Sequence, residues 1–256
     1  MSKDRVIICM KWGTLYPASY VNVLYTACRA NITGDFKFVC LTEDAEGLDS
    51  AIISYPIPDL DLESFHWKKG GWPKLAVFTQ DFFGLKGRAL FIDLDTVITG
   101  SLDPFFDYNT PKMVAIDTGP TWGVGAPDAT PLAGTGIFTF DLGAHSEILD
   151  HFMANRDAVV AQHRIEQIYV QSMVHDMAFW PADWVLSFKY HLRQPALVGL
   201  VKSPPNPKPE NRVIAFHGEP RPIDLVNGGI WGIGPHWGLG RVKWMVDYWR
   251  RHGGEA

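Results

Sequence analysis

Two aspartates one residue apart follow a short run of apolar residues. In ALFIDLDTV, Asp93 and Asp95 come directly after four apolar residues that are typical of a buried strand. Because side chains alternate along a strand, both carboxylates are expected on the same side of it. Like charges so close together are costly to bury, and a divalent cation relieves that cost. The pair therefore predicts a Mn²⁺ or Mg²⁺ site completed by the oxygens of a diphosphate, with solvated aspartates at a strand end as the plainer alternative.

The surrounding pattern predicts the elements that must position this pair. Apolar strands over 5–10, 36–44 and 88–95 alternate with helices over 19–30 and 73–83, which is typical of an α/β fold with a mostly parallel central sheet flanked by helices. Ligands of such sheets collect at the carboxyl ends of the strands. Farther along, we expect strands over 113–117, 136–142, 184–191 and 212–218, and one or two helices over 144–177. We expect a single domain over 1–256.

Composition narrows the function classes. The 256 residues carry 23 basic and 28 acidic side chains, a net charge of −5, which disfavours nucleic acid as a partner. The amino terminus lacks the pattern of a signal peptide and no run of about 20 apolar residues could span a bilayer, so we expect a cytoplasmic protein without a transmembrane segment. The three cysteines have no CxxC spacing and are expected to be reduced thiols.

The segment 71–106, GWPKLAVFTQDFFGLKGRALFIDLDTVITGSLDPFF, resembles a block of the family 8 glycosyltransferases, the sugar-nucleotide enzymes that include glycogenin and galactosyltransferases. In that family a lysine-bearing helix leads to a strand that ends in Asp-x-Asp, the DxD motif. Weaker similarities extend over most of the chain. They are ICMKWGTLYPASYVNVLYTACR near the amino terminus, GTGIFTFDL, the pair Glu166-Gln167, and RVIAFHGEPRP near the carboxyl end.

The resemblance implies a GT-A fold, with a nucleotide-binding half over about 1–104 and a sugar and acceptor half over about 105–256. It implies a metal-dependent hexosyltransferase that moves a sugar from a nucleotide-sugar donor, UDP-linked in the family, with retention of configuration. Asp93, Asp95 and His217 would hold Mn²⁺ or Mg²⁺, and Lys74 and Gln167 would act in catalysis. The donor would be bound by Trp12, Gly13, Thr14, Tyr16, Thr42, Leu94, Thr135, Gly136, Gly218 and Arg221.

Four positions depart from the family pattern. Gly134 stands where the family has a sugar-binding asparagine, Glu166 replaces an aspartate, and Arg221 replaces a phosphate-binding lysine. His217 directly precedes Gly218, where the family leaves two residues between them. These departures leave the sugar open.

Other readings stay open at this point. DLDTV also fits the first motif of haloacid-dehalogenase-like phosphatases, and a non-catalytic sugar-nucleotide binding protein is a third class. The acceptor can be a carbohydrate, a lipid-linked sugar or a protein. Trp12, Trp67, Trp72 and Trp122 could form an acceptor platform or belong to the core. The closing stretch RVKWMVDYWRRH is expected to be a helix packed on the core, with peripheral membrane contact as the alternative.

Overall fold

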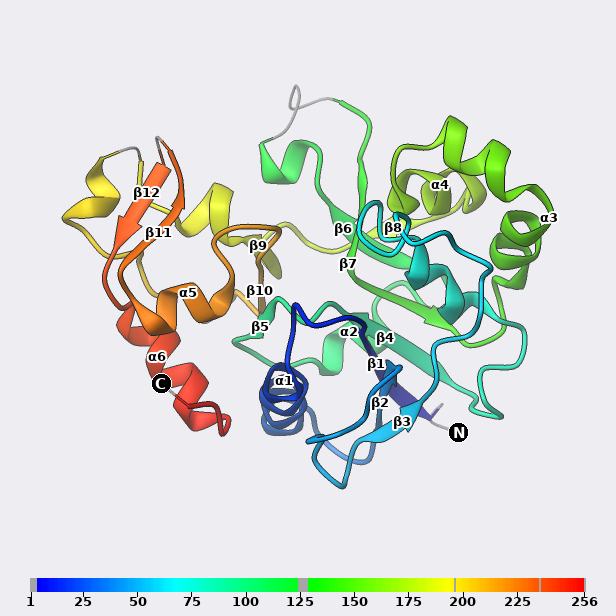
Figure 1. The fold of residues 1–256 in the computed structure, drawn as a ribbon, viewed down its shortest axis with the longest axis horizontal. Coiled ribbons are helices and arrows are strands. Elements are labelled where there is room, and N and C mark those ends of the chain that lie inside the picture. The colour runs from blue at the N-terminus through cyan, green and yellow to red at the C-terminus, as the bar shows by residue number, and fades with distance from the viewer. Residues whose placement is uncertain (1–3, 124–128, 196, 235, 256) are drawn as a thin grey trace.

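The computed structural model describes residues 4–123, 129–195, 197–234 and 236–255 (Figure 1). The strands are β1 (Arg5–Lys11), β2 (Lys37–Thr42), β3 (Ile53–Tyr55), β4 (Arg88–Ile92), β5 (Thr96–Ile98), β6 (Val114–Asp117), β7 (Ala133–Asp141), β8 (Ala178–Phe179), β9 (Val185–Ser187), β10 (Val213–Ala215), β11 (Ile230–Ile233) and β12 (His236–Leu239). The helices are α1 (Ala18–Ala30), α2 (Asp103–Asp107), α3 (Ser146–Gln162), α4 (Glu166–Met173), α5 (Pro222–Asn227) and α6 (Lys243–Arg251). Shorter helical turns are η1 (Trp72–Phe78), η2 (Pro120–Trp122), η3 (Phe188–Leu192) and η4 (Val198–Leu200).

A seven-stranded sheet forms the centre, in the order β3-β2-β1-β4-β7-β6-β8. The strands β3, β2, β1 and β4 are parallel, whereas β7 runs antiparallel to both of its neighbours, β4 and β6. The expected α/β class with a mostly parallel sheet is confirmed. The carboxyl ends of β1 and β4 therefore meet at one edge, where the loop after β1 faces the turn after β4.

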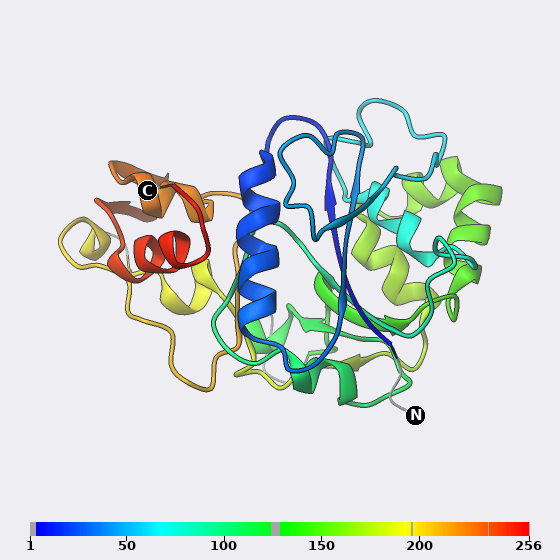
Figure 2. The same ribbon diagram turned by 90° about the horizontal axis from the view of Figure 1, so that it is seen from below.

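Helices cover both faces of this sheet. On β1, Ile7 and Cys9 pack in one apolar cluster with α1, while Val6 and Ile8 pack in a second cluster with residues of η1, α3 and α4. Figure 2 shows α1 on one side of β1 and these three helices on the other. Burial on both faces explains why β1, β2 and β4 read as unbroken apolar runs.

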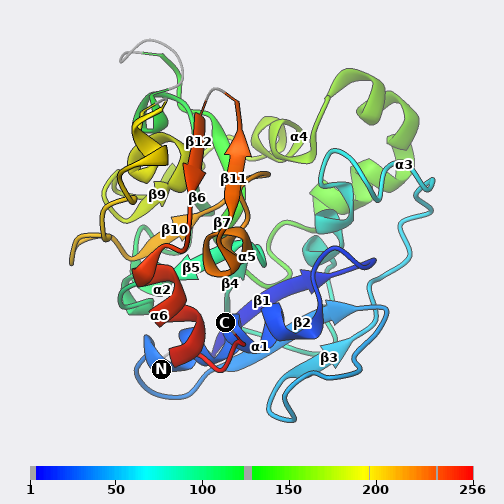
Figure 3. The same ribbon diagram turned by 60° about the vertical axis from the view of Figure 1, so that its left-hand side comes forward.

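The last third of the chain, together with β5, forms a second layer at one end of the molecule. This layer contains the small sheet β5-β10-β9, the hairpin β11–β12, α5 and α6 (Figures 1 and 3). Helix α6 packs on the core as expected, because the Trp249 ring lies 4.9 Å from the Tyr20 ring and the Tyr248 hydroxyl accepts a hydrogen bond from the Ile98 amide. Its apolar side is therefore already buried and is not free to lie on a membrane.

Several element predictions were wrong in their bounds, among them the strand expected over 212–218, which covers only 213–215. Strand β4 ends at Ile92, so Asp93 and Asp95 lie in the turn between β4 and β5 rather than within a strand. The helix expected over 73–83 is a 3₁₀ helix that ends at Phe78, because Thr79 is extended and Phe83 has a positive φ of 53°. The strand expected over 184–191 covers only 185–187, and the chain then winds into a π-helical turn, η3.

Candidate active site

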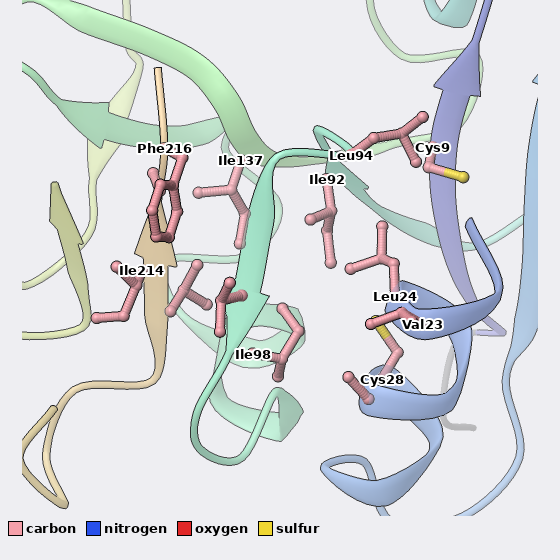
Figure 4. Close-up of a cluster of buried hydrophobic side chains, with 14 of the residues drawn as sticks. Cys9, Val23, Leu24, Cys28, Ile92, Leu94, Ile98, Ile137, Ile214 and Phe216 are labelled. Carbon is pink, nitrogen blue, oxygen red and sulfur yellow. The ribbon is translucent and has the colours of Figure 1, made fainter. Parts of the chain in front are cut away.

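The turn that carries the two aspartates is anchored by the residue between them. Leu94 is 5% exposed and belongs to the apolar cluster that also contains Cys9 and Ile92 (Figure 4). The amide of Asp93 continues the pairing with β7 by donating to the carbonyl of Gly136 at 2.8 Å. With Leu94 held in the core, both carboxylates remain at the walls of two cavities.

The larger cavity has a volume of about 660 Å³, within the range of ligand-binding clefts. Its wall combines Lys74, Asp93, Leu94 and Asp95 with the end of β1 and the loop after it (Met10, Trp12, Gly13, Thr14, Leu15 and Tyr16), and with Glu43, Trp67 and Lys68. Two hydrogen bonds order the loop after β1. The Gly13 amide donates to Glu43 Oε1 at 2.8 Å, and Trp12 Nε1 donates to the Trp67 carbonyl at 2.7 Å.

A smaller cavity of about 130 Å³ shares Lys74, Asp93 and Asp95 with the larger one. Its other walls come from β7, α4, η2 and the segment after β10, and include Gly134, Gly136, Gln167, Trp122 and His217. Residues that lie up to 143 positions apart along the chain, from Lys74 to His217, thus face one space. The shared acidic wall makes the two cavities parts of a single candidate site.

Lys74 is the cation of this wall. Its Nζ donates to Asp93 Oδ2 at 2.7 Å and to the carbonyl of Thr135 at 3.2 Å. Burial by itself would lower the pKa of Lys74, but the charges of Asp93 and Glu166 outweigh it and raise the pKa, so the ammonium stays charged. The turn Gly70-Gly71, with φ of 89° and 72°, leads the chain into η1 and sets the start of this helix.

The carboxylates outnumber the cation beside them. Burial raises the pKa of Asp93 although Lys74 opposes this rise, and burial together with the charge of Asp93 raises the pKa of Asp95 to about 7. The Tyr16 hydroxyl donates to Asp95 Oδ2 at 3.3 Å. One ammonium therefore balances only part of the negative charge that this wall would carry at neutral pH.

Glu166 lies behind Lys74 and adds a third carboxyl, which is buried. It is 2% exposed, its Oε2 accepts a hydrogen bond from the Thr135 hydroxyl at 2.8 Å, and its Oε1 is buried without a partner. Burial raises its pKa to about 7, with Lys74 acting in the opposite direction. Its neighbour Gln167, in contrast, faces the smaller cavity. The Glu-Gln pair thus splits into one residue that supports Lys74 and one that faces the cavity.

His217 is held by aromatic rings and a hydroxyl. Its ring packs against those of Trp122 and Tyr190, at centroid distances of 5.2 and 5.4 Å, and Nε2 shares a hydrogen bond with Ser187 Oγ at 2.7 Å. Burial, followed by the charges of Lys189 and Arg193, lowers the pKa of His217 to about 4. The imidazole is neutral at pH 7, which is the form that binds metals.

These donor groups fit a divalent cation by their chemistry. Two carboxylates with raised pKa values and excess negative charge suit a hard ion such as Mn²⁺ or Mg²⁺, which would take its remaining oxygens from a diphosphate and water. Within the ranges that the structure describes, no three His, Cys, Asp or Glu side chains come together closely enough to hold an ion. Ligation by His217 stays a prediction, since its Nε2 is bonded to Ser187.

Several of the expected site residues do not line either cavity. Thr42 is buried and its hydroxyl donates to the Asp44 carbonyl, and Thr135 bonds to Glu166 and Lys74 behind the wall. Arg221 directly precedes α5 and pairs with Asp224 at 4.0 Å, and Gly218 lies beside the Lys189 ammonium. Their roles in donor binding stay predictions.

The four tryptophans considered for an acceptor platform separate. Trp12 and Trp67 line the larger cavity and Trp122 the smaller one, whereas Trp72 is 2% exposed and stacks on Phe152. The surface role considered for Trp72 was therefore wrong, because the Gly70-Gly71 turn directs its ring into the core.

Sequence reasoning missed Lys189 and Glu43. Lys189 donates a hydrogen bond to the carbonyl oxygen of His217. Burial and the charge of Arg193 lower the pKa of Lys189, and the charge of Asp95 opposes this change. The sequence placed it in a strand, where its direction could not be assigned. Glu43 orders the loop after β1, and the signal that could have found it is its place at the carboxyl end of β2, a neighbour of β1 in the sheet.

Comparison with solved structures yields glycosyltransferases. The galactosyltransferase LgtC, solved with donor and acceptor sugar analogues, superposes with a TM-score of 0.59 over 98% of this chain and 97% of its own, at 12% identity. GlyE from Streptococcus pneumoniae TIGR4 gives 0.59 over 98% of this chain at 12% identity, and the bifunctional enzyme WbbM gives 0.54 over 87% at 13% identity. The chain covers 62% of GlyE and 47% of WbbM.

Neither protein-family models nor curated sequences give a match to this chain. At identities of 11–13% the structural likeness establishes the fold alone. The resemblance to family 8 glycosyltransferases seen in the sequence is confirmed at that level: this chain has the GT-A fold of the glycosyltransferases LgtC, GlyE and WbbM.

Proposed function

We propose that the chain is a metal-dependent glycosyltransferase that uses a nucleotide-diphosphate sugar, with a UDP-sugar as the donor to test first. The observation that carries the proposal is the acidic wall shared by the two cavities, with Asp93, Asp95 and Lys74 common to both. A nucleotide in the larger cavity would place its diphosphate at this wall and its sugar toward the smaller cavity. The GT-A fold supports the same class of reaction.

The polar residues at the two cavities would have different roles in the transfer reaction. Asp93 and Asp95 would hold Mn²⁺ or Mg²⁺, which supplies a Lewis acid for the negative charge that develops on the leaving diphosphate. Lys74 fixes the orientation of Asp93 and adds a permanent positive charge at the place where the two cavities meet. Gln167 would orient the transferred sugar through hydrogen bonds, because its side chain borders the smaller cavity.

The larger cavity would bind the nucleotide base. Trp12, Tyr16 and Trp67 supply aromatic surface on which a base can stack. We propose uridine as the base and retention of configuration as the outcome, in line with the family that the sequence resembles. The acceptor class is open, since carbohydrate, lipid-linked and protein acceptors would all approach through the same opening.

The phosphatase alternative is not favoured by the topology. That reading needs the DLDTV segment directly after the first strand of the fold, whereas here β4 is the fourth strand along the chain and lies between β1 and β7. A binding protein would hold the same nucleotide sugar at the same site but would not catalyse its transfer. Three measurements separate the classes. A transferase should hydrolyse UDP-sugars with manganese, a phosphatase should hydrolyse an aryl phosphate with magnesium, and a binding protein should be thermally stabilised by nucleotide without any turnover.

Replacement of Asp95 tests the proposal at the wall. Asp95→Asn keeps the size of the side chain and removes its charge, so Mn²⁺-dependent hydrolysis of the responsive UDP-sugar should fall by at least about 100-fold. Asp107→Asn, at a carboxylate whose side chain is 80% exposed, serves as the matched control and should keep full activity. Full hydrolysis by Asp95→Asn would contradict the metal-binding role, provided that both variants melt at the temperature of the parent protein.

A further inference from the structure

An apolar surface lies on the second layer of the molecule, away from the acidic wall. Six side chains from η4 and the hairpin β11–β12, with their flanking residues, are exposed by 43% (Trp237) to 89% (Val201). We call them the hairpin patch: Leu197, Val201, Ile230, Ile233, Trp237 and Leu239. Figure 3 shows the two strands of the hairpin side by side at this end of the molecule.

The hairpin is apolar on both of its faces. Trp231 points inward, where it is 4% exposed and packs at 5.9 Å from the Phe188 ring. Ile230 pairs directly with Leu239, and Gly232 with Trp237, so the side chains of Ile230, Leu239 and Trp237 stand together on the opposite, outward face. Ile233 lies on the same face as Trp231 but at the end of the strand, where it is 63% exposed. An outward face of a solvated hairpin is normally polar, and this one carries Ile, Leu and Trp instead.

The turn η4 extends the same surface. It packs tightly along β12, since a Cβ at Gly199 would lie 2.3 Å from the carbonyl oxygen of Trp237. Leu197 and Val201, on either side of η4, are 67% and 89% exposed. The patch is thus a joint surface of two segments rather than a set of scattered apolar residues, which are common on protein surfaces.

The two segments that build the patch carry charges of one sign, although Lys243 at their end is paired with Asp247. These segments, 189–202 and 228–243, contain five basic residues and no acidic residue: Lys189, Arg193, Lys202, Arg241 and Lys243. The carboxyl-terminal part from residue 189 onward has 10 basic against 5 acidic side chains, whereas residues 1–188 have 13 against 23. The net charge of −5 is therefore the sum of a basic part from residue 189 onward and an acidic part before it.

We propose that the hairpin patch docks on the surface of an anionic lipid bilayer. Aliphatic and tryptophan side chains would enter the interfacial region while Lys202 and Arg241 remain at the level of the acidic headgroups. A second copy of the chain is a poorer occupant, because a symmetric contact would bring two cationic ends together. Within the described ranges no helix is long and apolar enough to cross a membrane, so the contact would be peripheral.

Docking there would also hold the candidate site near the bilayer. The turn η3 leads from β9 toward the patch, and its Lys189 and Tyr190 contact His217 at the smaller cavity. The inference stands on the patch and its charge, and it holds whether or not the chain transfers sugars.

Binding to vesicles tests the proposal. The full chain should co-sediment with vesicles of phosphatidylcholine that contain phosphatidylglycerol, and should stay in the supernatant with phosphatidylcholine alone. The triple variant Val201→Ser, Ile230→Ser, Trp237→Ser should lower the partition coefficient at least about tenfold. Lys202→Glu with Arg241→Glu should lower it as well and remove its dependence on salt.

The matched control replaces exposed apolar side chains outside the patch. Phe65 and Met153 are 52% and 46% exposed, so Phe65→Ser with Met153→Ser removes exposed apolar surface elsewhere on the molecule and should leave vesicle binding unchanged. Absence of binding to acidic vesicles by the folded parent protein overturns the proposal, as does full binding by the triple variant. A dimer in sedimentation that the triple variant abolishes would identify a second copy as the occupant instead, which also overturns it. Activity on a UDP-sugar is measured separately and does not enter these outcomes.

Discussion

At the scale of single residues, the candidate site has more carboxyl groups than cationic groups. The half-buried Asp93 and Asp95 and the buried Glu166 surround one ammonium, that of Lys74. Burial raises the pKa of each carboxyl because the charged form loses its hydration, and Lys74 offsets only part of this cost. Such a cluster is stable when a proton or a bound cation supplies the missing positive charge, which links the stability of the protein to pH and to metal.

Glu166 predicts a specific pH dependence. Its pKa is near 4.5 in an unfolded chain and about 7 in the folded protein, so between these values the folded state holds a proton that the unfolded state has released. The free energy of unfolding therefore falls as the pH rises from about 4.5 to about 7. Glu166→Gln removes this contribution, and the fall in melting temperature between about pH 5 and about pH 8 should be smaller than in the parent protein.

The control for this experiment is the exposed Glu63, since Glu63→Gln should leave the pH profile unchanged. Asp95 contributes a dependence of the same sign, so the profile of Glu166→Gln should be flatter without becoming level. An unaltered slope in Glu166→Gln would show that Glu166 does not hold a proton in the folded state.

At the scale of elements, strand β7 determines the shape of the smaller cavity. It runs antiparallel beside β4 and carries Gly134 and Gly136, which both border the cavity. The missing side chains leave room next to Asp93, because a Cβ at Gly136 would lie 3.4 Å from Asp93 Oδ2. A strand that pairs with β4 in this direction therefore provides space for a ligand as well as hydrogen bonds.

Substitution of these glycines should separate binding from stability. In Gly136→Ala the new methyl group meets only ordinary contacts, so the unfolding free energy should change by less than about 0.5 kcal/mol while donor affinity falls several-fold. In Gly134→Ala the methyl group would lie 2.4 Å from Thr118 Cγ2, and rotating that side chain breaks its hydrogen bond to Leu132. This variant should lose about 1 kcal/mol. Calorimetric titration with UDP-sugar and urea unfolding measure the two effects.

At the scale of the whole molecule, the carboxyl-terminal layer is joined to the first half by one continuous core. The apolar cluster on the α1 face contains Ile7 from β1 and Trp249 from α6. Trp249 meets Tyr20 edge-on at an interplanar angle of 73°, and Tyr248 bonds to the Ile98 amide. The layer that supplies His217 is therefore fixed to the sheet that supplies the aspartates, and the site depends on this contact.

Loss of the Trp249 ring should destabilise the entire chain. Trp249→Ala removes a side chain that is 4% exposed, which typically costs about 3–5 kcal/mol. Trp237→Ala is the matched control, because the Trp237 ring is 43% exposed and its removal should cost less than about 1 kcal/mol. Urea unfolding followed by circular dichroism should show a single transition at a lower midpoint for Trp249→Ala. Separate unfolding of the carboxyl-terminal layer would contradict the shared core.

The sequence by itself determined the α/β class and the strands β1, β2, β4, β6 and β7 of the sheet, because these depend on local patterns of apolar runs and helical periodicity. It also placed Trp12, Tyr16, Lys74 and Gln167 among the site residues, and all four line the cavities. It erred where tertiary contacts override local preference, as at the strand expected over 184–191, which ends at Ser187 and is followed by a π-helical turn. It left Trp72 open between platform and core, and the tertiary structure places this ring in the core.

Only the tertiary structure decided how distant residues meet. The ion pair of Lys74 with Asp93, the position of Glu166 behind it, and the packing of Trp122 on His217 join segments that are 19 to 95 residues apart. The hairpin patch likewise exists only because η4 packs against β12. Local sequence fixes which side chains are available, whereas burial and charge balance between distant segments fix which of them face one another.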